Sequence, residues 1–227
     1  MLTARKSTHL FNLGGYQVRA DIGAVFLIVI LLLIFGGQGP QGLLFALVIA
    51  AITFVSILLH ELGHAVAVRR LGYGTSTIVF SFLGGVTQWR GRPTHGDSIR
   101  IAAAGPAVSL ALAGLALAGW AALRAAVPEQ GWFHRILFIT AFLNILWGAF
   151  NLLPIHPMDG GKILRSWLSM RHPGREAIRR SLIVSGVTGL ILMLAGAFMG
   201  LLFVTVLLGF LLFQNWQEWQ SHNQQGQ

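Results

Sequence analysis

The sequence contains no cysteine. This absence excludes disulfide bridges, thiolate zinc sites and cysteine nucleophiles. Charged residues are also scarce, because they make up 10% of the 227 residues whereas hydrophobic residues make up 55%. A water-soluble domain carries roughly a quarter charged residues, so this composition excludes an ordinary soluble protein. The high hydrophobic share likewise excludes an intrinsically disordered chain.

Acidic residues are the scarcest charged class, with only seven in the whole chain. Carboxylate chemistry must therefore use one of very few side chains. They are Asp21, Glu61, Asp97, Glu129, Asp159, Glu176 and Glu218. The formal net charge of +9 does not indicate a nucleic-acid partner here, because basic residues in a membrane chain first report topology.

Long apolar runs predict an all-α polytopic membrane protein with about six transmembrane helices, since a span needs about 20 apolar residues. The run 181–213 is too long for a ~30 Å hydrocarbon core at about 1.5 Å per residue, and we divide it near residues 196–200. Residues 75–92 are rich in Ser, Thr and β-branched residues around two glycines, which favours a re-entrant or interfacial β-hairpin. The spans are expected near residues 22–35, 43–68, 99–123 and 132–153 and in the two halves of 181–213.

With these spans, fourteen of the sixteen Lys and Arg residues fall on one side of the membrane. The positive-inside rule assigns that side to the cytoplasm. We therefore expect an integral protein of a bacterial or archaeal cell membrane, with both termini cytoplasmic.

The second span contains the sequence His60-Glu61-Leu62-Gly63-His64. Helical residues four apart lie on one face, so the two imidazoles can bind a single metal ion. Glu61 can then act as a general base toward water activated by that metal. Ionisable residues inside an apolar span are costly and usually functional, which adds weight to this short pattern.

A catalytic zinc ion usually takes three protein ligands. Most of the seven acidic residues are poor candidates for the third ligand, because they lie near the termini, among arginines or on the opposite side of the membrane. Asp159 follows the fourth span, in the segment 151–161 (NLLPIHPMDGG). The second and fourth spans run in the same direction, so HELGH and Asp159 are expected at similar depth near the cytoplasmic leaflet.

The pair HELGH and NLLPIHPMDGG resembles the site-2 protease family of intramembrane zinc metalloproteases. The segments 80–86 (FSFLGGV) and 104–106 (AGP) are similar to lesser features of that family. The resemblance implies one Zn²⁺ held by His60, His64 and Asp159, with Glu61 as the catalytic base and Asn151 as a residue that holds the substrate or its oxyanion. It covers residues 43–168 as the catalytic core, in a short form without PDZ or CBS domain.

The hairpin is also a candidate substrate site. An unwound substrate needs partners for its backbone groups, and β-addition would supply them. We expect the strand Ile78–Phe82 to pair with the substrate, so the candidate binding residues are Ile78, Phe80, Phe82, Gly84 and Gly85. A hairpin that merely plugs the bundle is the alternative.

The whole chain, 1–227, is interpreted as one membrane-embedded protease domain, with an N-terminal span in 1–42 and a C-terminal helical hairpin in 177–216. The resemblance implies single-span membrane proteins as substrates, such as anti-sigma factors, remnant signal peptides or membrane-tethered regulators. Besides the bilayer, no further partner or oligomeric state is indicated. Three alternatives stay open: a metal-ion transporter or channel, a zinc peptidase that uses Glu176 as its third ligand, and a catalytically silent membrane chaperone.

Overall fold

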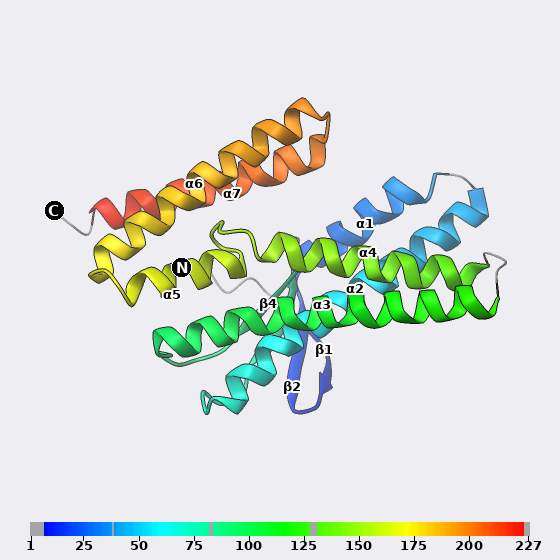
Figure 1. Ribbon diagram of the computed structural model, residues 1–227, viewed down its shortest axis with the longest axis horizontal. Helices are drawn as coiled ribbons and strands as arrows, with labels where there is room; N and C mark the ends of the chain where they lie inside the picture. The colour runs from blue at the N-terminus through cyan, green and yellow to red at the C-terminus, as the bar shows by residue number, and fades with distance from the viewer. Residues whose placement is uncertain (1–6, 38, 82–83, 128–130, 225–227) are drawn as a thin grey trace. The chain divides into compact units, whose positions relative to one another are not determined.

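The computed structural model describes residues 7–37, 39–81, 84–127 and 131–224. Figure 1 shows long helices and a small sheet that includes strands from the N-terminal part of the chain. The chain forms two compact units, Met1–Arg92 with Ala104–Gly148 and Pro93–Ala103 with Ala149–Gln227. We describe each unit by itself.

The first unit holds most of the apolar helices. They are α1 (Ile22–Phe35), α2 (Gly39–Arg70), the greater part of α3 (His95–Ala126), and α4 (Trp132–Asn151) up to Gly148. Asp21 caps α1 by accepting the Gly23 N–H at 2.6 Å and is itself buried. The sequence assigned no structural role to this acid beyond its place near the terminus.

A four-stranded sheet belongs to the same unit. Its strands β1 (Thr8–Leu13), β2 (Tyr16–Ala20), β3 (Thr77–Ser81) and β4 (Gly84–Gln88) lie in the spatial order β1-β2-β3-β4. The β3–β4 pair confirms the expected hairpin. The β1–β2 hairpin was not predicted, although Gly14 and Gly15, both at positive φ, form the two-residue turn that such hairpins favour.

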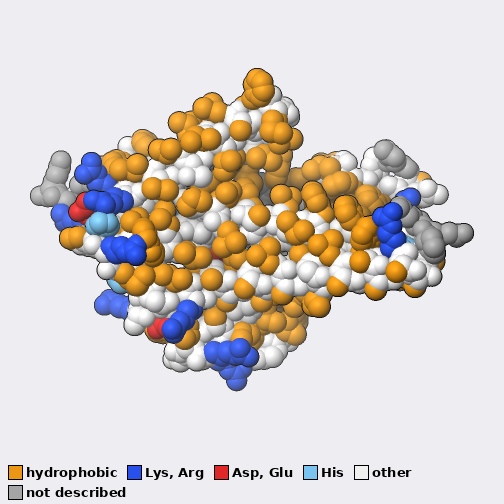
Figure 2. All heavy atoms as spheres, viewed as in Figure 1, with side chains coloured by type: hydrophobic (Ala, Val, Ile, Leu, Met, Phe, Trp, Pro, Cys, Tyr) orange, Lys and Arg blue, Asp and Glu red, His pale blue; other side chains and the backbone are white. Residues whose placement is uncertain are grey.

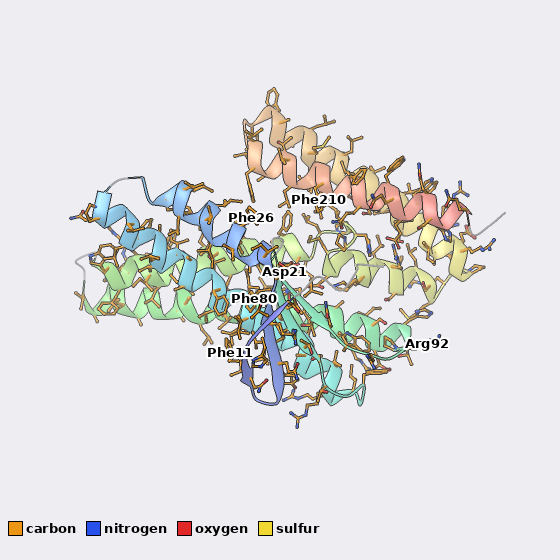
Figure 3. All side chains as sticks on the ribbon, turned by 180° about the vertical axis from the view of Figure 1, so that it is seen from behind. Phe11, Asp21, Phe26, Phe80, Arg92 and Phe210 are labelled. Atoms are coloured by element: carbon orange, nitrogen blue, oxygen red, sulfur yellow. The ribbon has the colours of Figure 1, made fainter. Side chains whose placement is uncertain are left out.

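The sheet packs on α2 through a small apolar core. β2 runs parallel to β3, which brings Val18 beside Ile78, and both are fully buried. Phe80 stacks on Phe54 of α2 with ring centroids 4.4 Å apart. The end of β2 is tied to β3 by the Asp21 N–H, which donates to the Phe80 carbonyl at 2.9 Å, and these two residues lie together in Figure 3.

The second unit contains α5 (Asp159–Ser169), α6 (Gly174–Phe198) and α7 (Leu202–Gln224). α6 packs on both of the others. The break between α6 and α7 lies at Met199–Leu201, where Gly200 has φ +72°. This confirms the division of the long apolar run near residues 196–200.

The expectation of about six membrane helices is roughly matched, because seven helices lie within the described residues. Four of them, α2, α3, α4 and α6, are long and apolar enough to cross a membrane, and α1 is a shorter apolar helix. Figure 2 shows apolar side chains over most of the visible face, with Lys and Arg side chains toward its margins. The chain is an integral membrane protein by these features and by the family to which it is assigned below.

Candidate metal centre

The α2 helix places three buried polar side chains on adjacent turns. His60, Glu61 and His64 are only 1%, 5% and 6% exposed. Their ligand atoms all lie within 4.8 Å of one another. The structure therefore brings together the three HELGH residues that the sequence singled out.

The two imidazoles are arranged as ligands of a single ion. Their Nε2 atoms are 3.2 Å apart. A tetrahedral zinc site with Zn–N bonds of about 2.0–2.1 Å holds two ligand nitrogens about 3.3 Å apart. The spacing of these donors fits zinc without rearrangement of α2.

Ser109 of α3 fixes the orientation of His60. Its Oγ lies 3.0 Å from His60 Nδ1, and its side chain is fully buried. When Nε2 binds a metal, Nδ1 carries the proton and donates to Ser109 Oγ, which sets the tautomer and the ring orientation. Sequence reasoning missed Ser109, because it is 49 residues from its partner.

Two glycines allow α3 to lie close to the metal ligands. A Cβ on Gly63 would meet the Ala104 carbonyl oxygen at 2.8 Å, and a Cβ on Gly105 would meet His60 Nε2 at 2.7 Å and overlap His64 Nε2. Small residues are the usual means by which membrane helices approach closely. Gly105 therefore contributes only backbone to the wall of the site.

The β4 strand covers Glu61. Thr87 donates its hydroxyl toward Glu61 Oε2 at 2.7 Å and also lies 2.9 Å from the Glu61 carbonyl oxygen. Gly85 lies so close that a Cβ there would be 2.9 Å from the carboxyl carbon of Glu61. Gly84, at φ +108°, packs in the same way against Trp147 of α4. The double glycine thus serves close packing at the site.

The predicted substrate strand needs revision. Ile78 and Phe80 of β3 are 0% and 3% exposed and belong to the apolar core. β3 is also paired on both edges, with β2 and with β4. The strands at the two ends of the sheet are β1 and β4, and β4 is the one that contacts Glu61. Phe82, the remaining strand candidate, lies outside the described residues.

Asn144 links two helices of the first unit. It is fully buried, and its amide donates to Ser56 Oγ on α2 at 2.8 Å. This bond ties α4 to α2 one turn from His60. Asn151, at the end of α4, is half-buried, and its catalytic role stays a prediction.

Asp159 begins α5 in the second unit and is 3% exposed. Lys162, one turn later, donates to its Oδ1 at 2.9 Å. Gly160 is required here, because a Cβ would overlap the Leu152 carbonyl. The role of Asp159 as the third zinc ligand stays a prediction.

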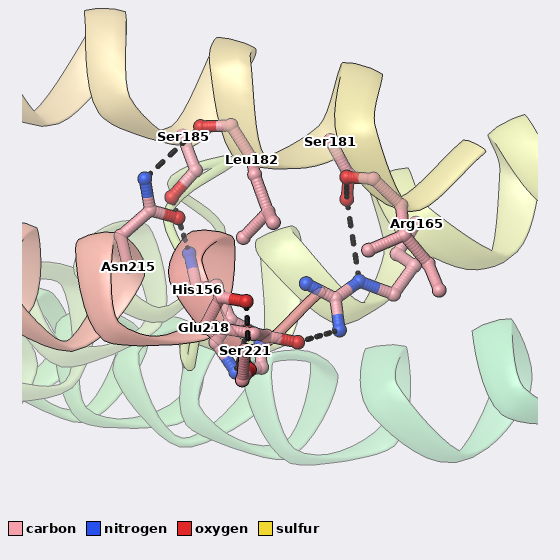
Figure 4. Close-up of polar contacts among 9 residues, drawn as sticks. His156, Arg165, Ser181, Leu182, Ser185, Asn215, Glu218 and Ser221 are labelled. Atoms are coloured by element: carbon pink, nitrogen blue, oxygen red, sulfur yellow. Dashed lines mark hydrogen bonds and ion pairs between the residues drawn. The ribbon is translucent and has the colours of Figure 1, made fainter. Parts of the chain in front are cut away.

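A group of polar side chains surrounds the loop that leads to Asp159, and we call it the α5–α7 cluster (Figure 4). The His156 N–H donates to Ser185 Oγ at 2.8 Å, and its Nε2 lies 3.0 Å from Glu218 Oε2. Arg165 donates to Glu218 Oε1 at 2.6 Å. The members are His156, Arg165, Ser181, Ser185, Asn215 and Glu218. Glu218 therefore holds a structural ion pair, a role its place near the terminus had not indicated.

Burial lowers the pKa of His156 from 6.5 to about 4, and the positive charges of Arg165 and Lys162 add to this shift, while Glu218 opposes it. For Glu218, burial works to raise the pKa of the carboxyl. The hydrogen bond from Arg165 and the nearby positive charges outweigh it and leave that pKa below its usual value. His156 is accordingly neutral at pH 7.

The other acids are accounted for locally. Glu176 pairs with Arg180 at 2.6 Å and is about half exposed, which confirms the solvated ion pair expected there. Asp97 is bonded to Thr94 and Arg100 at the start of α3. Glu129 lies outside the described residues.

Comparison with known proteins agrees with this site. The model of peptidase family M50 matches residues 47–128 and 121–192. A zinc metalloprotease of Methanocaldococcus jannaschii is 30% identical over 190 residues, which are 84% of this chain and 54% of that protein. The putative zinc metalloprotease Rip3 of Mycobacterium tuberculosis is 40% identical over 124 residues, which are 54% of this chain and 31% of that protein. The chain thus spans about half the length, or less, of these curated relatives.

A solved structure is similar over almost the whole chain. The site-2 protease from Methanocaldococcus jannaschii matches with a TM-score of 0.69 and 27% sequence identity, covering 94% of this chain and 95% of that one. The family model spans both the HELGH helix and the Asp159 segment. The resemblance drawn from those two motifs is confirmed, and the chain belongs to peptidase family M50.

Proposed function

We propose that the protein is a zinc metalloprotease that hydrolyses peptide bonds within or near the transmembrane segments of other membrane proteins. The observation that carries this proposal is the pair of buried Nε2 atoms of His60 and His64, 3.2 Å apart beside Glu61. They lie in α2, a helix long and apolar enough to cross a membrane. The zinc metalloprotease names of the relatives support the same chemistry.

The roles of the side chains follow from their placement. Zinc, when bound, would acidify water and polarise the scissile carbonyl. His60 and His64 hold the metal, with Ser109 fixing the first of them. Glu61 accepts the proton from the attacking water and passes it to the leaving amine. Asn151 is proposed to donate to the developing oxyanion.

Asp159 is the proposed third ligand. It is a buried carboxylate at the start of α5, and Lys162 donates to its Oδ1. Carboxylates that bind a metal are usually hydrogen-bonded themselves, and Lys162 supplies such a bond here.

The substrate is proposed to be a membrane protein with a single span, presented in an extended form. β4 is the strand at the end of the sheet that borders Glu61. An added strand would receive backbone hydrogen bonds from β4 beside the general base. The basic loops support cytoplasmic termini and an active site toward the cytoplasmic leaflet. Anti-sigma factors, remnant signal peptides and membrane-tethered regulators are proposed substrates.

The test uses the full chain in detergent micelles with a single-span model substrate. Wild type is expected to contain one zinc per chain and to cleave. Glu61→Gln should keep the zinc and lose cleavage, because a general base is worth about 10²–10⁴ in rate. Asp159→Ala should lose both the bound zinc and the cleavage activity. Glu176→Gln, which removes a solvated ion pair, is the matched control and should behave as wild type.

The results discriminate among the open alternatives. Zinc with full cleavage in Glu61→Gln would refute the assigned base. Retained stoichiometric zinc in Asp159→Ala would refute the third ligand. Zinc without any cleavage in wild type would favour a metal transporter or a silent relative.

A further inference from the structure

The Glu61 carboxylate is held from outside its own helix. It is 5% exposed, and buried carboxylates require hydrogen-bond donors. Thr87 of β4 supplies one, with its hydroxyl 2.7 Å from Oε2. The contact joins residues 26 positions apart, so it exists only because β4 lies over α2.

The two oxygens of Glu61 have different surroundings on β4. Gly85 and Thr87 are two residues apart, so they share one face of the strand. A Cβ on Gly85 would be 2.9 Å from Oε1 and would overlap Glu61 Cγ, so a glycine is what lets β4 lie this close to the glutamate side chain. Thr87 binds Oε2 instead. One face of β4 therefore binds Oε2 through a hydroxyl and packs against the rest of the side chain through a glycine.

We propose that Thr87 is a positioning residue for Glu61: its hydroxyl holds Oε2 and leaves Oε1 as the oxygen that takes the proton from water. This inference rests on the proposed function of Glu61. A hydroxyl bond fixes the rotamer of a carboxylate that would otherwise turn about its side-chain torsions. Displacement of a reacting group by about 1 Å can cost 10²-fold in rate.

The position of Thr87 also links the base to the substrate strand. Thr87 lies on the strand to which the substrate is proposed to add. Any strand that fixes β4 then fixes the donor to Glu61.

The kinetic test compares two substitutions with a matched control. Thr87→Val keeps the shape and removes the hydroxyl, and we expect kcat to fall roughly 10- to 100-fold with KM changed by less than about twofold. Thr87→Ser restores the hydroxyl and should recover most of kcat. Thr77→Val makes the same change in the neighbouring strand β3 and should leave kcat unchanged.

Two further measurements separate positioning from a structural role. Zinc content and the melting temperature of Thr87→Val should match wild type. Difference infrared spectra of the zinc-free protein should show a carboxylate band shifted by Thr87→Val, and that shift should vanish in a Glu61→Gln background.

Several results would overturn the inference: full kcat in Thr87→Val, lost zinc or lost folding in that variant, no recovery in Thr87→Ser, or an unshifted carboxylate band. A wild type that binds zinc yet cleaves nothing refutes the proposed function. In that case the infrared shift shows the contact to Glu61, and the catalytic role of Thr87 is refuted along with the function.

Discussion

Gly105 offers the sharpest test of the metal centre, because the structure leaves no room for a side chain there. A Cβ on Gly105 would lie 2.7 Å from His60 Nε2, which is 0.7 Å inside the 3.4 Å at which ordinary contact begins, and still closer to His64 Nε2. These are the two atoms assigned to the metal. Gly105→Ala must therefore displace both imidazoles or move α3 away from α2.

Metal sites tolerate little displacement, with ligand distances held within about 0.2 Å. A shift several times larger should weaken zinc binding by about 100-fold, the upper end of the cost of disturbing groups around a metal. The assay is a zinc titration of the metal-free protein against a competing chelator, with cleavage and melting temperature measured on the same samples.

Gly114→Ala is the matched control in the same helix, because a Cβ there meets nothing within 4 Å. It should bind zinc as wild type does, and its helix should gain about 1 kcal/mol from the better propensity of alanine. Wild-type zinc affinity in Gly105→Ala would refute the placement of the metal between His60 and His64.

Three further predictions concern the surroundings of the site. Ser109→Ala should weaken zinc binding by about 10- to 100-fold, because His60 loses the acceptor that orients its ring; the same chelator competition measures it. His156 has a pKa near 4 when folded against 6.5 when exposed, so the unfolded chain takes up a proton first and stability should fall by up to about 3 kcal/mol as the pH drops from 6.5 to 4. Thermal unfolding measured across this pH range should show the fall in stability, and His156→Gln should show a smaller fall. An equal fall in both proteins would contradict the assigned pKa. Phe80→Ala should cost about 3–5 kcal/mol by emptying the sheet core, while Phe11→Ala, at an exposed position, should cost far less in the same unfolding experiment.

Local features were predictable from sequence alone. The HELGH spacing places both histidines on one helix face whatever surrounds the helix, since a four-residue separation is a property of the helix itself. The break before α7 and the β3–β4 hairpin were likewise marked by glycines between apolar runs. The β1–β2 hairpin carried a similar signal at Gly14-Gly15.

Composition and long apolar runs determined the class of the protein, and the HELGH spacing determined its metal-binding helix, because both can be read along the chain without knowing which segments pack together. Tertiary structure decided what surrounds that helix. Ser109 and Thr87 each contribute a hydroxyl group, and Gly105 contributes the lack of a side chain. All three come from segments that are distant in sequence from the HELGH motif. No local periodicity encodes such a contact, since it depends on which strand and which helix turn pack against α2. That packing makes β4, and not β3, the strand that contacts Glu61, and it sets the ring orientation of His60 through Ser109.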